Sequence, residues 1–157
     1  MNIKLLKLPI LTSVGGIIFY LLNFIMAFLG FGGVWTSKQS EILSYIPLIL
    51  AIIILIIIGL ILRRIYSRKD FIKSSTLLVI YSIIILIVQR LSLYFGIYNS
   101  TVDFILYLPT AIFQIMISLS TKYNNSEIGN LIFLILSLFE PYIFVLFGFG
   151  KSSKGIR

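Results

Sequence analysis

The chain contains no cysteine and no histidine, and only five of its 157 residues are acidic. Without cysteine there are no disulfides and no thiolate nucleophiles, and without histidine the commonest zinc, copper and haem ligands are missing. A metal site would have to be built from five carboxylates scattered along the sequence. We therefore predict no bound metal and no cofactor.

Charge of any kind is scarce: charged residues make up 11% of the chain, against about 25% in soluble proteins. Hydrophobic residues make up 59%, and the mean hydropathy is +1.10. This composition indicates an integral membrane protein. The 32 isoleucines against 3 alanines fit an AT-rich coding genome, which suggests a bacterial cell membrane.

Five apolar segments approach the length of about 20 residues that a helix needs to cross the hydrocarbon core. They are residues 8–34, 42–62, 76–98, 104–120 and 131–150. The fourth is short and carries Pro109 in its second turn, so it is either a short span or a re-entrant segment. Since the connections are short and no repeat is visible, residues 1–157 are predicted to form one compact all-α membrane domain. It would have five hydrophobic helices, four of them full transmembrane spans.

The first segment follows Lys4 and Lys7, as the apolar region of a secretory signal follows its basic residues. A signal region is about 7 to 15 residues long and ends at a small-residue cleavage site. This segment is longer and continues to Trp35, an aromatic residue suited to the membrane interface. It is therefore predicted to be an uncleaved first span.

Basic residues cluster in the connection between the second and third segments, which we call the basic loop. Its five cations are Arg63, Arg64, Arg68, Lys69 and Lys73. Basic loops are retained in the cytoplasm, so the basic loop and the amino terminus are predicted to be cytoplasmic. The tail, residues 151–157, is also basic, yet five crossings would place it outside. Either the fourth segment does not cross or the tail departs from the rule.

The basic loop needs no nucleic acid to explain it, because topology accounts for cations beside two spans. Its other expected partners are anionic lipid headgroups, worth about 1 kcal/mol per Lys or Arg, or an acidic region of a membrane protein partner. No nucleic-acid binding is predicted.

Polar or small residues recur on one face of three segments. They are Ser13, Gly16, Tyr20, Asn23, Ala27 and Gly30 in the first, Ser75, Ser82, Gln89 and Gly96 in the third, and Tyr107, Thr110, Gln114 and Ser118 in the fourth. Such stripes allow close helix packing and hydrogen bonds between helices. They predict either dry packing seams or the wall of a polar cavity.

Charged residues inside the apolar segments are functional candidates because an unpaired charge there costs at least ~2.5 kcal/mol on insertion scales. Arg90 is expected in the outer half of the membrane and Glu140 near the middle, and we predict that they pair. Pro141 should free the carbonyl of Ser137 and kink the fifth helix. The candidate polar cluster consists of Asn23, Gln89, Arg90, Gln114, Glu140 and Pro141.

An enzymatic activity is not expected, since the only carboxylate in an apolar segment is Glu140 and no nucleophile motif is present. No catalytic residue is assigned. Two function classes remain. The first is a small non-enzymatic membrane protein that binds a partner, such as an accessory or immunity-type subunit. The second is a transport or solute-binding subunit with a small polar cavity in the outer half of the bilayer.

Overall fold

The computed structural model describes residues 3–30, 45–113, 115 and 127–149, and this part of the chain contains helices and no strand. The α-helices are α1 (Ile3–Gly30), α3 (Ile46–Arg63), α4 (Arg68–Tyr94), α5 (Ser100–Tyr107) and α7 (Glu127–Phe139). Two 3₁₀ helices, η1 (Leu108–Thr110) and η2 (Glu140–Gly148), continue α5 and α7. The chain is thus all-helical over the residues described.

Within the described ranges, four helices are long and apolar enough to cross a membrane: α1, α3, α4 and the continuous α7–η2 unit. The fourth segment is different, because α5 has eight residues and becomes η1 at Leu108, where Pro109 occupies one of the first positions. Proline cannot donate the backbone hydrogen bond that would continue the α-helix. Residues 116–120 of this segment lie outside the described part.

Helix α4 begins at Arg68, well before the predicted start at residue 76. Ser67 and Asp70 form a capping box, in which Asp70 N–H donates to Ser67 Oγ at 3.3 Å and Ser67 N–H donates to Asp70 Oδ2 at 2.8 Å. The predicted start was wrong because hydropathy marks the apolar stretch, whereas the cap sets the helix end. Three of the five cations of the basic loop therefore lie on the first turns of α4.

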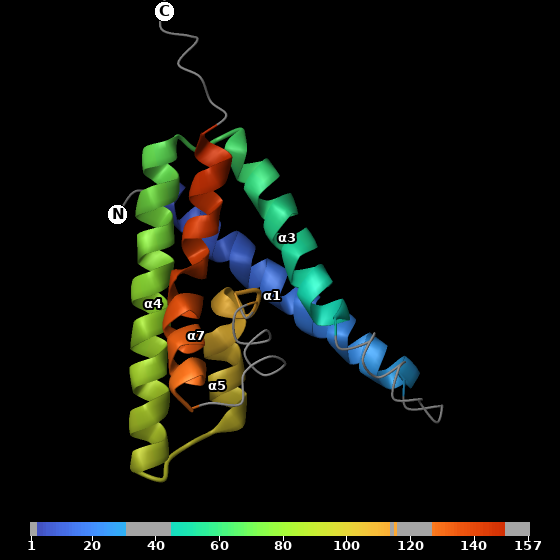
Figure 1. The fold of residues 1–157 in the computed structure, drawn as a ribbon, viewed down its shortest axis with the longest axis vertical. Coiled ribbons are helices and arrows are strands. Elements are labelled where there is room, and N and C mark those ends of the chain that lie inside the picture. The colour runs from blue at the N-terminus through green and yellow to red at the C-terminus, as the bar shows by residue number, and fades with distance from the viewer. Residues whose placement is uncertain (1–2, 31–44, 114, 116–126, 150–157) are drawn as a thin grey trace, which may run out of the picture.

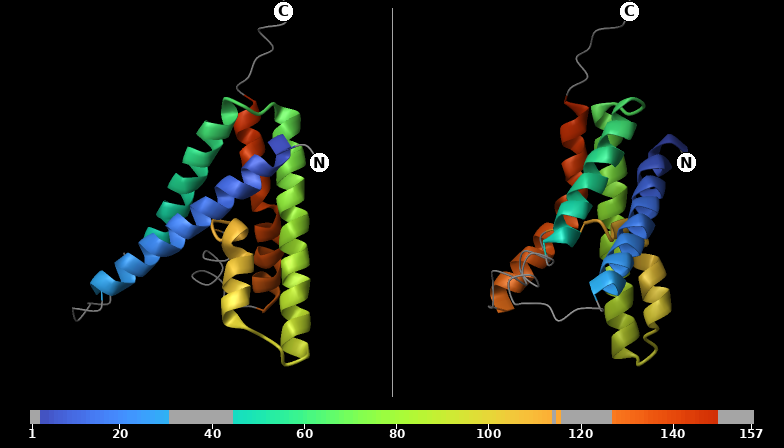
Figure 2. Two further views of the ribbon diagram at one scale, coloured as in Figure 1. Left: turned by 180° about the vertical axis from the view of Figure 1, so that it is seen from behind. Right: turned by 90° about the vertical axis from the view of Figure 1, so that its right-hand side faces the viewer.

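The helices are arranged around α4 (Figures 1 and 2). The α7–η2 unit runs antiparallel beside α4, α1 crosses at an angle, and α3 diverges from the top of Figure 1. The start of α1, the turn between α3 and α4, and the end of η2 lie together at this end, which we call the basic end. The turn after Tyr94 marks the opposite far end.

At the basic end, the first turn of α4 contacts both the start of α1 and the end of η2. Lys4 of α1 forms an ion pair with Asp70 at 2.7 Å. Near the end of η2, the Arg68 guanidinium carbon lies 4.0 Å from the centre of the Phe149 ring, an attractive cation–π arrangement. Helix α5 and η1 reach only part of the way from the far end (Figure 1). Because the four long helices run back and forth along the molecule, both ends of the described chain lie at the basic end.

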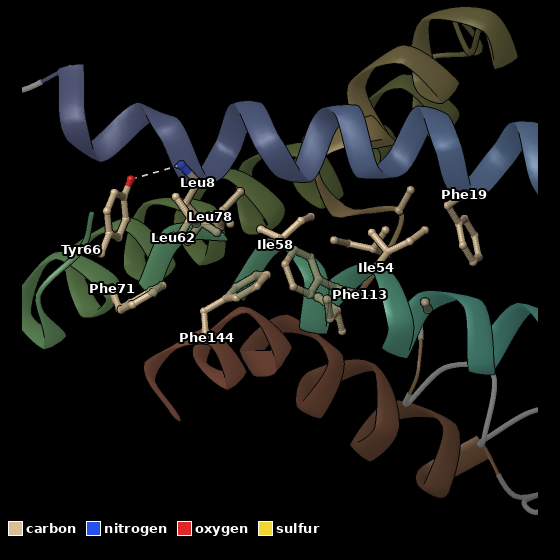
Figure 3. Close-up of a cluster of buried hydrophobic side chains, with 14 residues drawn as sticks. Leu8, Phe19, Ile54, Ile58, Leu62, Tyr66, Phe71, Leu78, Phe113 and Phe144 are labelled. Atoms are coloured by element: carbon tan, nitrogen blue, oxygen red, sulfur yellow. Dashed lines mark hydrogen bonds between the residues drawn. The ribbon is translucent and has the colours of Figure 1, made fainter. Parts of the chain in front are cut away.

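A cluster of buried apolar side chains lies between α1, α3, α4 and η2, with Ile54, Ile58, Tyr66, Phe71 and Phe144 among its members (Figure 3). Helix α3 contributes one buried face and leaves its other isoleucines exposed, as expected of a helix at the bundle edge. In a membrane, those exposed isoleucines suit contact with lipid tails.

Buried hydroxyl groups at the basic end satisfy the backbone that proline disrupts. Pro9 frees the carbonyl of Leu5 within α1, and Ser74 Oγ donates to that carbonyl at 2.9 Å. The Tyr66 hydroxyl donates to the Lys4 carbonyl and accepts from Leu8 N–H at 3.2 Å (Figure 3), so it stands between two groups that a regular helix would join directly. Freed backbone groups within the membrane need such partners.

The small-residue stripe of α1 is a close packing contact at its centre. A Cβ atom on Gly16 would lie 2.0 Å from the carbonyl oxygen of Leu108 in η1. One on Gly15 would lie 2.9 Å from a methyl group of Ile54. The two glycines therefore allow α1 to touch η1 on one side and α3 on the other, which is the packing-seam interpretation of this stripe.

Candidate functional site

A cavity of about 230 Å³, which we call the far cavity, lies between α4, the α5–η1 unit and α7, in the half of the molecule nearer the far end. Helix α4 supplies Ser82, then Gln89 two turns later, and Arg90 directly after Gln89. The other polar residues lining it are Tyr107, Thr110 and Ser137, and the apolar ones are Leu86, Phe113, Leu134 and Leu138. The polar residues of two predicted stripes therefore meet here.

Hydrogen bonds fix the side chain of Gln89 at one end of this cavity. Its Nε2 donates to Asp103 Oδ2 at 2.9 Å, and its Oε1 accepts from the Tyr107 hydroxyl at 2.9 Å. Asp103 also accepts from the Tyr98 hydroxyl at 3.2 Å. Desolvation and then the negative charge of Asp103 raise the pKa of Tyr98, so the phenol remains protonated and able to donate at neutral pH.

Asp103 is a residue of this site that is not among the predicted site residues. The signal was present in "NSTVD", because Asn99 accepts hydrogen bonds from the backbone N–H groups of Thr101 and Val102 and so starts α5. Gly96 has φ +69°, which permits the turn from α4. A helix that starts after this turn brings Asp103 back beside Gln89.

Arg90 lines the same cavity and is exposed, so its guanidinium stands where the cavity meets its surroundings. Within the described residues Arg90 has neither an ion pair nor a hydrogen bond. The positive charge of Arg90 interacts electrostatically with the phenol of Tyr107. At about 1.5 Å per residue, Arg90 lies about 33 Å along α4 from Arg68, one turn before the exposed ring of Tyr94. This is close to the far end of the helix.

The predicted pair of Arg90 and Glu140 is not formed, and helix register explains why. Ser75 Oγ donates to the Pro141 carbonyl at 2.8 Å, so Glu140 lies near the level of Ser75. The rise from Ser75 to Arg90 is about 22 Å, too far for the two side chains to meet. Glu140 is therefore nearer the basic end than expected, and Arg90 is nearer the far end.

The Glu140 carboxylate contacts the backbone that follows η1. Its Oε2 accepts from Ile115 N–H at 3.3 Å. It also lines a mainly apolar cavity of about 260 Å³ with Leu55, Phe139 and Ile143. The carboxylate thus supplies an acceptor to backbone that has just left η1.

Pro141 is the second residue of η2, where the α-helix gives way to 3₁₀ helix at Glu140. The kink and the freed Ser137 carbonyl stay predictions. Ser137, one turn earlier, uses its own hydroxyl to donate to the Leu134 carbonyl at 2.7 Å. The Pro141 carbonyl itself accepts from Ser75, and Thr76 and Tyr142 share a hydrogen bond of 2.8 Å. Both contacts join η2 to α4.

The predicted six-residue cluster is therefore divided. Gln89 and Arg90 line the far cavity, and Glu140 and Pro141 lie closer to the basic end. Asn23 bonds within α1, where its amide donates to the Phe19 carbonyl at 2.8 Å. Gln114 lies outside the described residues.

Among the described residues, no group of three or more Asp or Glu side chains lies close enough to hold a metal ion. Comparison with protein-family models, with curated proteins and with solved structures finds no match. The far cavity, with one guanidinium and several hydroxyl oxygens, is best suited to holding a polar group by hydrogen bonds and charge.

Proposed function

We propose that the chain is a multi-pass integral membrane protein of a bacterial cell membrane, with four spans and a re-entrant α5–η1 segment. The amino terminus and the basic end would face the cytoplasm, as the positive-inside rule predicts. The meeting of α1, the α3–α4 turn and η2 at one end supports this topology, because an even number of crossings removes the conflict with the basic tail.

We propose further that it is a non-enzymatic solute-binding or transport subunit whose site is the far cavity. The observation that supports this is a space of about 230 Å³ bordered by Arg90, Gln89 and four hydroxyl side chains. Polar side chains in a membrane domain usually pair with one another or border a cavity or pathway. The volume is below the 300 to 1,000 Å³ typical of drug-sized ligand sites, so a small solute or headgroup would fit.

A partner-binding accessory subunit is the second candidate, in which the polar stripes serve helix packing. The contact of Gly16 with Leu108 and the bond of Ser75 to Pro141 favour this interpretation for those stripe positions. The two candidates differ in one respect that can be measured. Water reaches the far cavity in the first and is excluded from it in the second.

Single cysteines in this cysteine-free chain test the proposal. Cysteine at Ser82 should react with a small water-soluble thiol reagent, because a hydrated thiol ionises to the reactive thiolate. Cysteine at Ser75, on the same face of α4 but buried, should not react, nor should cysteine at Ile57 on the exposed face of α3. If position 82 stays as unreactive as position 75, the solute-binding proposal fails and the partner-binding one is favoured.

The same set tests orientation. Cysteine at Ser67, in the turn between α3 and α4, should be protected from an impermeant maleimide in intact cells and should label after the membrane is opened. Labelling in intact cells would reverse the topology.

A further inference from the structure

We infer that the far cavity binds a phosphate group through Arg90, and that the molecule carrying it bears hydroxyl or ammonium donors. This rests on the proposed function and names its ligand class. The two possible sources are a phospholipid headgroup and a water-soluble phosphate, and the experiment below separates them.

The charge of Arg90 is the first reason. One ion pair among the described residues joins Lys4 to Asp70 at the basic end, far along α4 from Arg90. Near Arg90 the available carboxylate is Asp103, which already accepts from Gln89 and Tyr98. A guanidinium presents five N–H donors in a planar fork that matches the oxygens of phosphate or carboxylate.

The hydroxyl groups of the cavity supply the second reason. Three of the four donate their proton to a nearby backbone carbonyl: Ser82 to Leu78 at 2.9 Å, Thr110 to Tyr107 at 3.0 Å and Ser137 to Leu134 at 2.7 Å. The fourth, the Tyr107 hydroxyl, donates to Gln89 Oε1 at 2.9 Å. A hydroxyl oxygen has two lone pairs that remain free to accept. The cavity therefore offers one cation and several acceptors, which suits a ligand with an anion and O–H or N–H donors.

The position of Arg90 is the third reason. It lies about 25 Å beyond Lys73 along α4, close to the thickness of the hydrocarbon core of about 30 Å. The aromatic rings of Tyr94, Phe95 and Tyr98 follow it and are exposed, as in the belts that mark membrane interfaces. Phosphate groups of the leaflet at the far end, and solutes on that side, are both within reach of this depth.

The experiment measures how fast cysteine at Ser82 reacts in the purified full-length protein in an uncharged detergent. The probes are a short-chain phosphatidylglycerol, the matching phosphatidylcholine and glycerol 3-phosphate. A probe at about ten times its dissociation constant leaves about a tenth of the sites free, so the reaction should slow about tenfold. Slowing by glycerol 3-phosphate identifies a water-soluble source, and slowing by phosphatidylglycerol alone identifies a headgroup.

Variants assign the effect to Arg90. Adding Arg90→Gln should abolish the protection, Arg90→Lys should keep part of it because the charge remains without the planar fork, and Lys73→Gln should leave it unchanged. Lys73→Gln removes the same charge from the same helix at the basic end, so it controls for general attraction of anions.

Equal slowing by phosphatidylcholine, or protection that survives Arg90→Gln, would overturn the inference. So would fast reaction at position 82 that neither anionic probe slows, while the proposed function would then still stand. An unreactive position 82 in the absence of any probe would overturn both.

Discussion

Ser75 and Ser82 lie seven residues apart on one face of α4, yet their surroundings differ. Ser75 is fully buried and donates to a carbonyl on η2, whereas Ser82 donates to a carbonyl of its own helix and lines the far cavity. Around Ser75, helices α1, α4 and η2 converge. Around Ser82, α4 faces the short α5–η1 unit and α7. A sequence stripe therefore becomes a packing contact where long helices meet and a cavity wall where a short segment leaves space.

The largest expected effect comes from overcrowding the contact between α1 and η1, which positions η1 beside the far cavity. Gly16→Ala places a methyl group 2.0 Å from the Leu108 carbonyl oxygen, and backbone cannot move aside as a side chain can. We expect a loss of about 3 kcal/mol in the free energy of unfolding in mixed micelles, at the upper end for overpacking.

Gly15→Ala is the matched control, because its new methyl group meets side-chain methyls of Ile54 and Ile58 at 2.9 and 3.0 Å. Its loss should be clearly smaller. Equal losses for the two variants would mean that η1 does not rest on α1 as described.

The next effect tests the basic end. Tyr66→Phe removes a buried hydroxyl that bonds to α1 through the Lys4 carbonyl and the Leu8 N–H. Stranding buried polar groups costs about 1 to 3 kcal/mol, so we expect a loss of about 2 kcal/mol and a lower thermal midpoint.

The control for this variant is Tyr94→Phe at the far end of α4, where the ring is 83% exposed and its hydroxyl has no hydrogen-bond partner among the described residues. Its midpoint should match that of the unmodified protein. A Tyr66→Phe protein as stable as this control would show that the hydroxyl contributes nothing to joining α1 to the α3–α4 turn.

The smallest effect is expected at the two serines themselves. Ser75→Ala removes a hydrogen bond between helices, which in membrane proteins is worth about 0.6 kcal/mol on average and up to about 1.7 kcal/mol. Ser82→Ala removes a bond within one helix beside a cavity and should change stability very little. Unfolding of the two variants under identical conditions measures the difference. A larger loss of unfolding free energy at position 82 would contradict our assignment of Ser75 to a packing contact and Ser82 to a cavity wall.

Much of the architecture could be predicted from hydropathy, because a helix must offer about 20 apolar residues to span a membrane. The four long helices agree with four predicted segments, and Pro109 and Pro141 both mark places where α-helix gives way to 3₁₀ helix. The predicted pairing of Arg90 with Glu140 was wrong, because the ends of an apolar stretch do not mark the helix starts that set the depth of each side chain.

Composition and pattern by themselves determined the all-helical class, the weakness of the fourth segment and the residues able to line a polar site. These properties are local, since they depend on apolar length, proline and helical spacing. Only the tertiary structure decided which polar residues meet. The contact of Ser75 with Pro141 sets the register between α4 and η2, and the turn at Gly96 returns Asp103 to Gln89. Such registers arise from packing between helices distant in the chain, which no single segment encodes.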